Sequence, residues 1–392
     1  MSVTVLLCGT GGYGRLYLEE VLTNGALHDT ELLAAVEPYL TQEAIEALGK
    51  RPCYNTLEEA LTHHQPDLVI VSTPIQFHVP QVKLALAHGC HVLCEKPLAA
   101  TIQDCRELIE ARNAAGRIAA VGFQWSYAQA MLAAKRDILD GVYGKPVSLK
   151  ARVLWPRTAE YYARGGGWAG KIQDGQGRTI LDSVASNATA HYLFNMLFLL
   201  GDSLESAAQP DTLTAGLYRA NPIETFDTSF IQMKAAGADI HYYASHAVPA
   251  DVHPAFEYHF EKGSITFDSK QRLGTSQVTG HIDNRTVEYG DPYQNELRKI
   301  WVMVNAVRGG AAPTCTLEAA MQHVVAVNAA HTSMTPRNFP TELVYKEGSL
   351  TWVDGLSELM LSCYQDNRMP EGECGCEMGK TVACNTLQTF TV

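Results

Sequence analysis

The sequence predicts an α/β protein with two main domains. The first is an N-terminal Rossmann domain on a doubly wound parallel sheet, and the second is a C-terminal α+β domain with a large, mostly antiparallel open sheet. Three observations predict this: a glycine-rich turn joins the first apolar run to an amphipathic helix, short apolar runs then alternate with helical segments, and longer alternating or β-branched runs follow between Gly, Asp and Pro turns. A chain of 392 residues also suits two domains better than one.

Strands and helices alternate up to about residue 122. The expected strands are 3–8, 31–36, 67–72, 91–94 and 118–121, and the expected helices are one directly after the glycine-rich turn and then 41–48, 57–63, 80–87 and 102–115. A ligand of such a sheet binds beyond the carboxyl ends of its strands. We therefore expect the loops at 9–14, 73–78 and 95–97 to meet at a cofactor.

The first of these loops has the spacing G-x-G-x-x-G between a strand and a helix. In this context one glycine makes the tight turn, one lets the backbone approach a pyrophosphate, and one lets helix and strand pack closely. The helix N-terminus adds free N–H groups and a partial positive charge. The predicted dinucleotide-binding residues are Gly9, Gly11, Gly12, Tyr13 and Gly14.

An acidic residue, Glu37, follows the second strand. Its carboxylate can accept both ribose hydroxyls of NAD and would repel the 2′-phosphate of NADP. Pro38 and Tyr39 offer no cation, and only Arg51 could fold back to supply one. The sequence therefore favours NAD over NADP.

The second part of the chain reads as a sheet with helices packed nearby. The expected strands are 147–155, 213–218, 228–233, 240–247, 255–260, 264–267 and 286–289, and the expected helices are 128–139, 188–200, 294–307 and 317–331. Segment 350–364 reads as a further helix, followed by an irregular arm. We therefore predict an NAD-binding domain at 1–123, a substrate-binding and oligomerisation domain at 124–334 and a C-terminal extension at 335–392.

The charge balance and hydropathy exclude several classes of protein. Acidic residues outnumber basic ones by 42 to 30, giving a net charge of −12, which argues against nucleic acid or an anionic membrane as a partner. The longest apolar candidate, 192–200, is too short to span a bilayer, so a cytoplasmic protein is expected. An open sheet with an exposed apolar face needs covering, which suggests a homodimer or homotetramer.

Four of the ten cysteines gather near the end of the chain: Cys363, Cys374, Cys376 and Cys384. Their spacing matches no common structural zinc pattern. We expect reduced thiols and no metal site.

At this point the motifs resemble the Gfo/Idh/MocA oxidoreductases. The resemblance is carried by the glycine-rich loop, by Thr73-Pro74 with His78, and above all by the run Cys94-Glu95-Lys96-Pro97-Leu98-Ala99; it extends through Ala188-Thr189-Ala190-His191 with Gly201 to the helices ending near Ser333. It implies an NAD(P)-dependent dehydrogenase acting on CH–OH groups of carbohydrates. The cofactor-binding residues it indicates beyond the glycine loop are Thr73, Pro74, His78, Glu95, Lys96 and Gln124.

The chain departs from the family pattern on the substrate-domain helix. Asn187 stands where the family commonly has an aspartate, and Phe194 where it often has a further acid. Proton transfer must then fall to Lys96, to His191 or to Asp182. Lys96 is the best general base, because a lysine beside a positive nicotinamide in a closed site has a lowered pKa. His191 reads as a catalytic or substrate-binding residue, the alternative being a core histidine.

Aromatic residues, arginines and glycines crowd segment 155–171. Aromatic faces pack on sugar C–H surfaces and cations bind hydroxyls or carboxylates, so this loop suits a carbohydrate, although it could also be a packed loop or a dimer contact. The predicted substrate-binding residues are Lys96, Arg157, Tyr162, Trp168, Lys171, Asp182, Asn187 and His191.

These observations leave three hypotheses for function. The first is an NAD-dependent oxidoreductase acting on a secondary hydroxyl of a sugar, sugar acid or cyclitol. The second is an NAD-recycling glycosidase or lyase that works through a transient keto-sugar with no net redox change. The third is a non-catalytic, cofactor-binding sensor.

Overall fold

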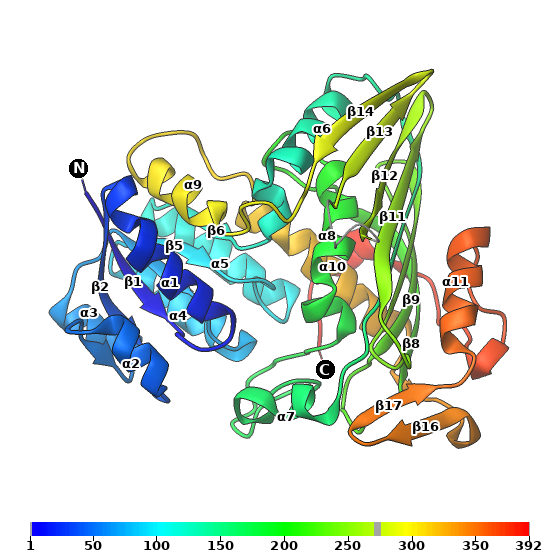
Figure 1. The fold of residues 1–392 in the computed structure, drawn as a ribbon, viewed down its shortest axis with the longest axis horizontal. Coiled ribbons are helices and arrows are strands. Elements are labelled where there is room, and N and C mark those ends of the chain that lie inside the picture. The colour runs from blue at the N-terminus through cyan, green and yellow to red at the C-terminus, as the bar shows by residue number, and fades with distance from the viewer. Residues whose placement is uncertain (1, 270–275, 392) are drawn as a thin grey trace.

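The computed structural model describes residues 2–269 and 276–391 and confirms the predicted fold class, with a Rossmann domain beside a larger sheet (Figure 1). The first sheet is wholly parallel with the strand order β3-β2-β1-β4-β5-β6. Its strands are β1 (Val3–Cys8), β2 (Thr30–Val36), β3 (Cys53–Tyr54), β4 (Leu68–Val71), β5 (His91–Cys94) and β6 (Ala119–Val121). The order reverses between β1 and β4, which is where such sheets bind ligands.

Helices cover both faces of this sheet because its strands are apolar on both sides. One face packs against α3 (Leu57–His63), α4 (His78–Ala87) and α5 (Ile102–Ala115). The other packs against α1 (Tyr13–Asn24) and α2 (Gln42–Leu48).

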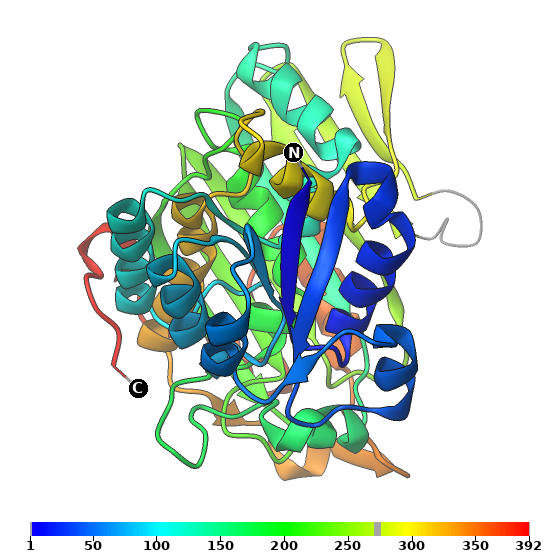
Figure 2. The same cartoon turned by 90° about the vertical axis from the view of Figure 1, so that its left-hand side faces the viewer.

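A helix from much later in the chain completes the second face. Helix α9 (Arg298–Val307) buries Ile300, Met303 and Val304 in the same cluster as the odd-numbered side chains of β1. Figures 1 and 2 both show α9 against the Rossmann domain. The expectation that segment 294–307 packs beside the antiparallel sheet is therefore wrong: the helix lies elsewhere and begins at Arg298.

The second sheet has ten strands in the order β14-β13-β12-β11-β7-β10-β9-β8-β15, with β18 also paired to β8. Its pairs are antiparallel except for β7 with β10 and β8 with β15. The strands are β7 (Pro146–Leu154), β8 (Pro210–Arg219), β9 (Thr228–Ala235), β10 (Ala238–Ser245), β11 (Val252–Phe260), β12 (Gly263–Asp268), β13 (Val278–Ile282), β14 (Arg285–Gly290), β15 (Arg337–Asn338) and β18 (Val382–Ala383).

Three helices lie between this sheet and the Rossmann domain: α6 (Gln129–Leu139), α8 (Ala190–Leu199) and α10 (Leu317–Ser333) (Figure 1). Helix α8 is buried almost all round and carries the family-like histidine near its N-terminus. Helix α10 packs on α5, α8 and β8 and so joins the two domains. No helix in residues 2–269 and 276–391 is long and apolar enough to cross a membrane.

The C-terminal extension covers the opposite face of the large sheet (Figure 1). The expected helix at 350–364 is wrong in its first part: β17 (Leu350–Val353) pairs with β16 (Val344–Glu347), and α11 spans Leu356–Asp366. Gly355, with φ of 72°, sits in the left-handed region between them and turns the chain.

The face under α11 is polar. Lys150 Nζ donates to the carbonyl of Tyr364 at 2.9 Å, and the Tyr243 hydroxyl donates to the carbonyl of Arg368 at 2.9 Å. Among the described residues, Val147 is the one exposed large apolar side chain on this sheet. The premise of an exposed apolar face is therefore wrong, and a homo-oligomer stays a prediction without that support.

Candidate functional site

The glycines of the first loop divide into two kinds. A Cβ on Gly9, whose φ is +87°, would lie 2.3 Å from the carbonyl oxygen of Ser72, and one on Gly14 would lie 2.2 Å from the carbonyl oxygen of Gly9. These two glycines are required by packing. Around Gly11 and Gly12 a Cβ would meet nothing within 4 Å. This open space lies at the N-terminus of α1, where the helix carries a partial positive charge, so the loop fits a pyrophosphate.

Glu37 lies beside this loop at the end of β2. Its carboxylate accepts from the backbone N–H of Thr10 at 3.1 Å and of Tyr39 at 3.0 Å. Arg51, in contrast, donates from Nε to the carbonyl of Leu32 at 3.1 Å, so its guanidinium does not reach Glu37. An acid without a neighbouring arginine suits unphosphorylated ribose hydroxyls.

His78 joins two of the predicted cofactor loops. It is 1% exposed, and its ring nitrogens lie 2.8 Å from the carbonyls of Pro97 and Thr73. Thr73 also donates from its hydroxyl to Gln81 at 2.7 Å, and Pro74 follows it in the same loop. His78 is thus a buried brace that holds the loop at 73–78 against the loop that carries Lys96.

The carboxylate of Glu95 takes part in a buried network of an ion pair and hydrogen bonds. Lys299, fully buried on α9, forms an ion pair with it, and the Tyr17 hydroxyl donates to the same oxygen at 2.7 Å. A Cβ on Gly122 would lie 2.4 Å from that oxygen, so Gly122 leaves room for the pair. Burial raises the pKa of Glu95, but Lys299 and Lys96 outweigh it and the net pKa is lowered.

The predicted residues Tyr13 and Gln124 meet next to this pair. The Tyr13 hydroxyl donates to Gln124 Oε1 at 3.1 Å, and Lys299 Nζ lies 4.5 Å from the centre of the Tyr13 ring. Lys299, Tyr17 and Gly122 were not predicted from the sequence. The one available signal was a lysine inside the apolar stripe of a predicted helix.

Asn187 lies on an unusual turn. The expected helix at 188–200 begins only at Ala190, and Val184–Ala188 (η4) form a single π-helical turn before it. Ser183 and Ser186 cap this turn reciprocally, each side chain accepting from the other's backbone N–H at 3.1 and 2.8 Å. Such single π-helical turns are rare in proteins overall, but many of those that occur lie at functional sites.

Lys96, Asn187 and Asp182 form one hydrogen-bonded chain. Lys96 Nζ donates to Asn187 Oδ1 at 2.7 Å and to its carbonyl at 2.9 Å. Asn187 Nδ2 donates to Asp182 Oδ1 at 2.9 Å, and the backbone N–H of Gly170 donates to Asp182 Oδ2 at 2.7 Å. Since a carboxylate only accepts and an ammonium only donates, the amide can take only this orientation.

Burial shifts the pKa values of the three ionisable side chains at this site, which are Lys96, Asp182 and His191. It lowers the pKa of Lys96 to about 8, although Glu95 and Asp182 oppose it. Burial raises the pKa of Asp182, while Gly170 N–H, Arg164 and Asn187 oppose it. For His191, burial and then the nearby Lys96 hold the pKa well below its usual value, so the imidazole is neutral at pH 7.

His191 lies at the start of α8 with its ring 5.7 Å, centre to centre, from that of Phe123. Its buried Nδ1 has no hydrogen-bond partner among the described residues. A buried polar atom without a protein partner can take one from a ligand, so this nitrogen is available to a ligand atom.

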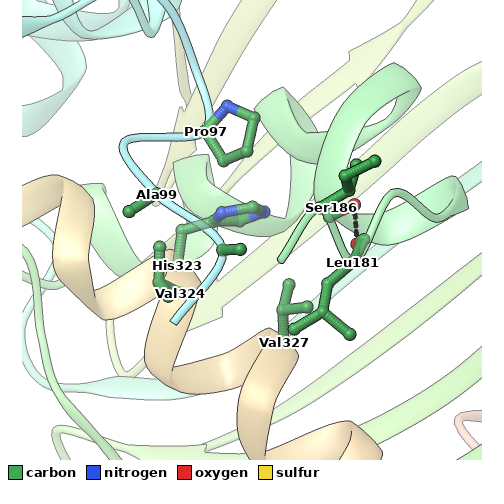
Figure 3. Close-up of a pocket in the computed structure, with 9 residues that line it drawn as sticks. Pro97, Ala99, Leu181, Ser186, His323, Val324 and Val327 are labelled. Atoms are coloured by element: carbon green, nitrogen blue, oxygen red, sulfur yellow. Dashed lines mark hydrogen bonds between the residues drawn. The ribbon is translucent and has the colours of Figure 1, made fainter. Parts of the chain in front are cut away.

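A small cavity of about 10 Å³ lies between the loop after Lys96, the segment before η4, and α10 (Figure 3). His323 contributes its ring to this space, and burial lowers its pKa to about 4. The cavity holds no more than one water-sized molecule, so it is not a substrate site. Its lining is Pro97, Ala99, Ala100, Ile180, Leu181, Ser186, His323, Val324 and Val327.

The aromatic segment 155–171 contains α7 (Ala159–Gly167), which bends at residues 164–166. Arg157 and Tyr162 are half-buried, and the Tyr162 hydroxyl has no hydrogen-bond partner among the described residues. Trp168 packs against a small apolar cluster that includes Leu181, next to Asp182. The Lys171 side chain is exposed. Its backbone carbonyl accepts a hydrogen bond from the backbone N–H of Asp182 at 3.1 Å.

Arg164, in the same segment, was not predicted from the sequence as a site residue. Its guanidinium lies 3.5 Å from the centre of the Tyr161 ring and 4.8 Å from that of Trp168. Its charge lowers the pKa values of both Lys96 and Asp182, after the larger effects of burial and nearer groups. Within residues 2–269 and 276–391, no three or more His, Cys, Asp or Glu side chains are grouped to hold a metal.

Comparisons with known proteins agree with this geometry. Residues 3–123 match the profile of an oxidoreductase family with an NAD-binding Rossmann fold. The chain is 32% identical over 129 residues to D-glucoside 3-dehydrogenase of Escherichia coli, covering 32% of this chain and 37% of that protein. It is 30% identical over 166 residues to inositol 2-dehydrogenase of Pseudomonas fluorescens, covering 41% and 49%. The chain thus spans less than half the length of these curated relatives.

Solved structures match more of the chain. The WlbA dehydrogenase of Bordetella pertussis, in complex with NADH and UDP-GlcNAcA, superposes with a TM-score of 0.70 at 22% identity, covering 85% of this chain and 96% of that one. A levoglucosan dehydrogenase in complex with NADH gives a TM-score of 0.69 at 19% identity, covering 85% and 98%. At these identities the structures establish the shared two-domain fold.

Proposed function

Because the N-terminal domain belongs to the Gfo/Idh/MocA family of NAD-binding oxidoreductases, we propose that this chain is an NAD-dependent oxidoreductase acting on a secondary hydroxyl of a sugar, sugar acid or cyclitol. Dehydrogenation of a secondary alcohol needs a group that removes the hydroxyl proton. The chain's own residues supply it at Lys96.

The observation that carries the proposal is the pair of hydrogen bonds from Lys96 to Asn187. A neutral amine has two N–H bonds and one lone pair. With both N–H bonds directed to Asn187, at 2.7 and 2.9 Å, the lone pair points away from Asn187 and is free to accept a proton. The pKa of about 8 makes this neutral form accessible near physiological pH.

Asn187 and Asp182 act on Lys96 as positioning residues. Asp182 fixes the amide through Nδ2, so that Oδ1 faces the amine. Neutral His191 neither repels Lys96 nor competes for its proton at pH 7, and it can donate or accept a hydrogen bond at a substrate oxygen.

The glycine loop and Glu37 would hold the cofactor, the loop at its pyrophosphate and Glu37 at a ribose. When bound, NAD supplies the chemistry of accepting a hydride from the carbon that carries the hydroxyl. The carboxylate of Glu37 and the distant anchoring of Arg51 support NAD rather than NADP.

The experiment is absorbance at 340 nm with NAD or NADP and a panel of sugars, sugar acids, inositols and glycosides, with products identified in parallel. Stoichiometric NADH with a ketone product is expected, and Lys96→Ala should lose turnover while still binding NAD. Product that requires NAD but leaves no net NADH would replace this proposal with the recycling glycosidase or lyase. Cofactor binding without any product would favour a sensor.

A further inference from the structure

Two arginines near the site lack an anionic partner. Arg157 donates from Nη1 to the carbonyl of Pro156 at 3.2 Å, and its buried Nε has no partner among the described residues. Arg164 donates to the carbonyl of Tyr161. Neither forms an ion pair in the described part of the chain, whereas Arg178, a little further on, pairs with Asp174 at 2.6 Å.

Both guanidinium groups lie close to aromatic rings. Arg164 lies 3.5 Å from the centre of the Tyr161 ring and Arg157 lies 5.1 Å from it, on the same tyrosine. Trp155 and Trp168 provide further ring contacts at 5.7 and 4.8 Å. A guanidinium beside an aromatic ring can still direct N–H groups at a ligand, and its planar edge matches a carboxylate with two parallel hydrogen bonds.

This pair of arginines is connected to the general base. Gly170, at the end of the arginine segment, is hydrogen-bonded to Asp182, and Asp182 is linked through Asn187 to Lys96. The charge of Arg164 lowers the pKa of Lys96, so the two cations are close enough to interact. Burial and then the charges of Arg157 and Arg164 lower the pKa of His246 to about 3, which places both arginines around one buried ring.

The carboxylates around this segment are already engaged. Asp182 accepts from Gly170 N–H and Asn187 Nδ2. Asp227 accepts from the backbone N–H groups of Ala220 and Asn221. Glu224 accepts from a backbone N–H of the same segment, at residue 172. None of these carboxylates forms an ion pair with Arg157 or Arg164, so both guanidinium groups keep donors for an external acceptor.

We propose that the substrate is a sugar acid, whose carboxylate is bound by Arg164 and Arg157 while its reacting hydroxyl faces Lys96. This rests on the proposed function and narrows its substrate class. Binding a carboxylate gives the two guanidinium groups an anionic partner and acceptors for their N–H groups.

The test compares molecules that differ in charge and little in shape. D-glucuronate and D-galacturonate are compared with their uronamides, with D-gluconate and with glucose 6-phosphate, at constant ionic strength. Binding is measured by calorimetry on the NADH-loaded protein, and turnover is measured with NAD. At least one sugar acid is expected to bind ten-fold or more tightly than its amide.

Matched variants locate the contact. Arg164→Gln and Arg157→Gln should each reduce the preference for acid over amide at least five-fold, and Arg164→Lys should restore part of it. Arg368→Gln, which removes an arginine paired with Glu373 on the far side of the sheet, should leave the preference unchanged.

Three results would overturn the proposal: no acid binds better than its amide, the phosphate binds better than every acid, or Arg164→Gln weakens acid and amide equally. Failure of the proposed function looks different. In that case the sugar acids bind in calorimetry with an Arg164-dependent preference, yet no member of the panel reduces NAD.

Discussion

In the proposed mechanism, the residue that sets the pKa of the base is Asn187, where the resembled family commonly has an aspartate. An amide at 2.7 Å from Lys96 Nζ gives a hydrogen bond without adding charge, so burial keeps the pKa of Lys96 at about 8. An aspartate at this position would favour the ammonium and raise that pKa.

We therefore expect Asn187→Asp to move the acidic limb of the kcat/KM profile to higher pH, by about one unit. The ammonium will keep the nearer carboxylate ionised, even if Asp182 then takes up a proton. Asp182→Asn is the matched variant: it removes a charge that raises the pKa of Lys96, so its limb should move to lower pH. Shifts in the same direction for both variants would refute this assignment.

Burying the Lys96 side chain should lower the free energy of unfolding of the protein. Its pKa is about 8 in the folded protein against an ordinary 10.5, so between these values the folded protein binds fewer protons than the unfolded chain. The free energy of unfolding then rises with pH across this window, and the destabilisation is complete below pH 8.

Lys96→Met should consequently unfold at higher urea concentration than the parent at pH 7, by about 1–3 kcal/mol after its lost hydrogen bonds are counted. The advantage should shrink between pH 8 and 10.5 while activity is absent throughout. A stability difference that does not change with pH would contradict the lowered pKa.

Individual residues show which parts of the site could be predicted from the sequence and which could not. The glycine spacing and Glu37 follow from local pattern, because strand, turn and helix are neighbours in sequence. The contact of Lys96 with Asn187 joins residues far apart in the chain and depends on a π turn. Arg164 stands in the segment singled out from the sequence, but its contacts with the Tyr161 and Trp168 rings and its effect on the pKa of Lys96 are visible only in the structure.

At the scale of elements, α9 shows why periodicity is insufficient. The stripe of Ile300 and Met303 predicts a helix with one buried face, but not which sheet it covers. In the structure it brings Lys299 to Glu95, a contact across 204 positions of sequence. The helix at 350–364 failed for a local reason instead, since Gly355 separates a short strand from α11.

The Lys299–Glu95 pair should be a major contribution of α9 to stability. Lys299→Met leaves a buried carboxylate without its counter-charge, which should cost about 3–5 kcal/mol in urea unfolding. Lys83→Met, which removes an exposed pair with Glu107, should cost less than about 1 kcal/mol. Adding Glu95→Gln to Lys299→Met should recover part of the loss. Equal effects of the two lysine variants would show that the buried pair contributes little.

At the scale of the whole molecule, the C-terminal extension changes how the large sheet is used. The sequence pattern predicted seven of its ten strands and missed β13, β15 and β18. It also could not tell a face that awaits a partner from one that the chain covers itself. Lys150 and Tyr243 on this face bond to the chain at and beyond α11. Further along, strand β18 of the extension pairs with β8, and the chain then returns to the Rossmann domain.

The end of this extension ties the domains together beside the site. Gln103 on α5 exchanges two hydrogen bonds with the backbone of Phe390, at 2.7 and 3.0 Å. The Phe390 ring is 8% exposed and joins a cluster with Ile180 and Leu181, against which Trp168 packs. The tail therefore supports the segment that carries the two unpaired arginines.

Phe390→Ala should weaken this support in two measurable ways. Loss of a buried ring should lower the free energy of unfolding by about 2–3 kcal/mol, toward the lower end for aromatic truncations because the site is close to the terminus. It should also raise KM several-fold with little change in kcat, since the arginine segment loses packing while Lys96 and Asn187 keep their hydrogen bonds. Limited proteolysis near Gly165–Gly167 should quicken in parallel.

Thr391→Ala, at an exposed neighbouring position, is the control and should change none of these quantities. If Phe390→Ala lowers stability but leaves KM and cleavage unchanged, the tail stabilises the fold without supporting the substrate segment.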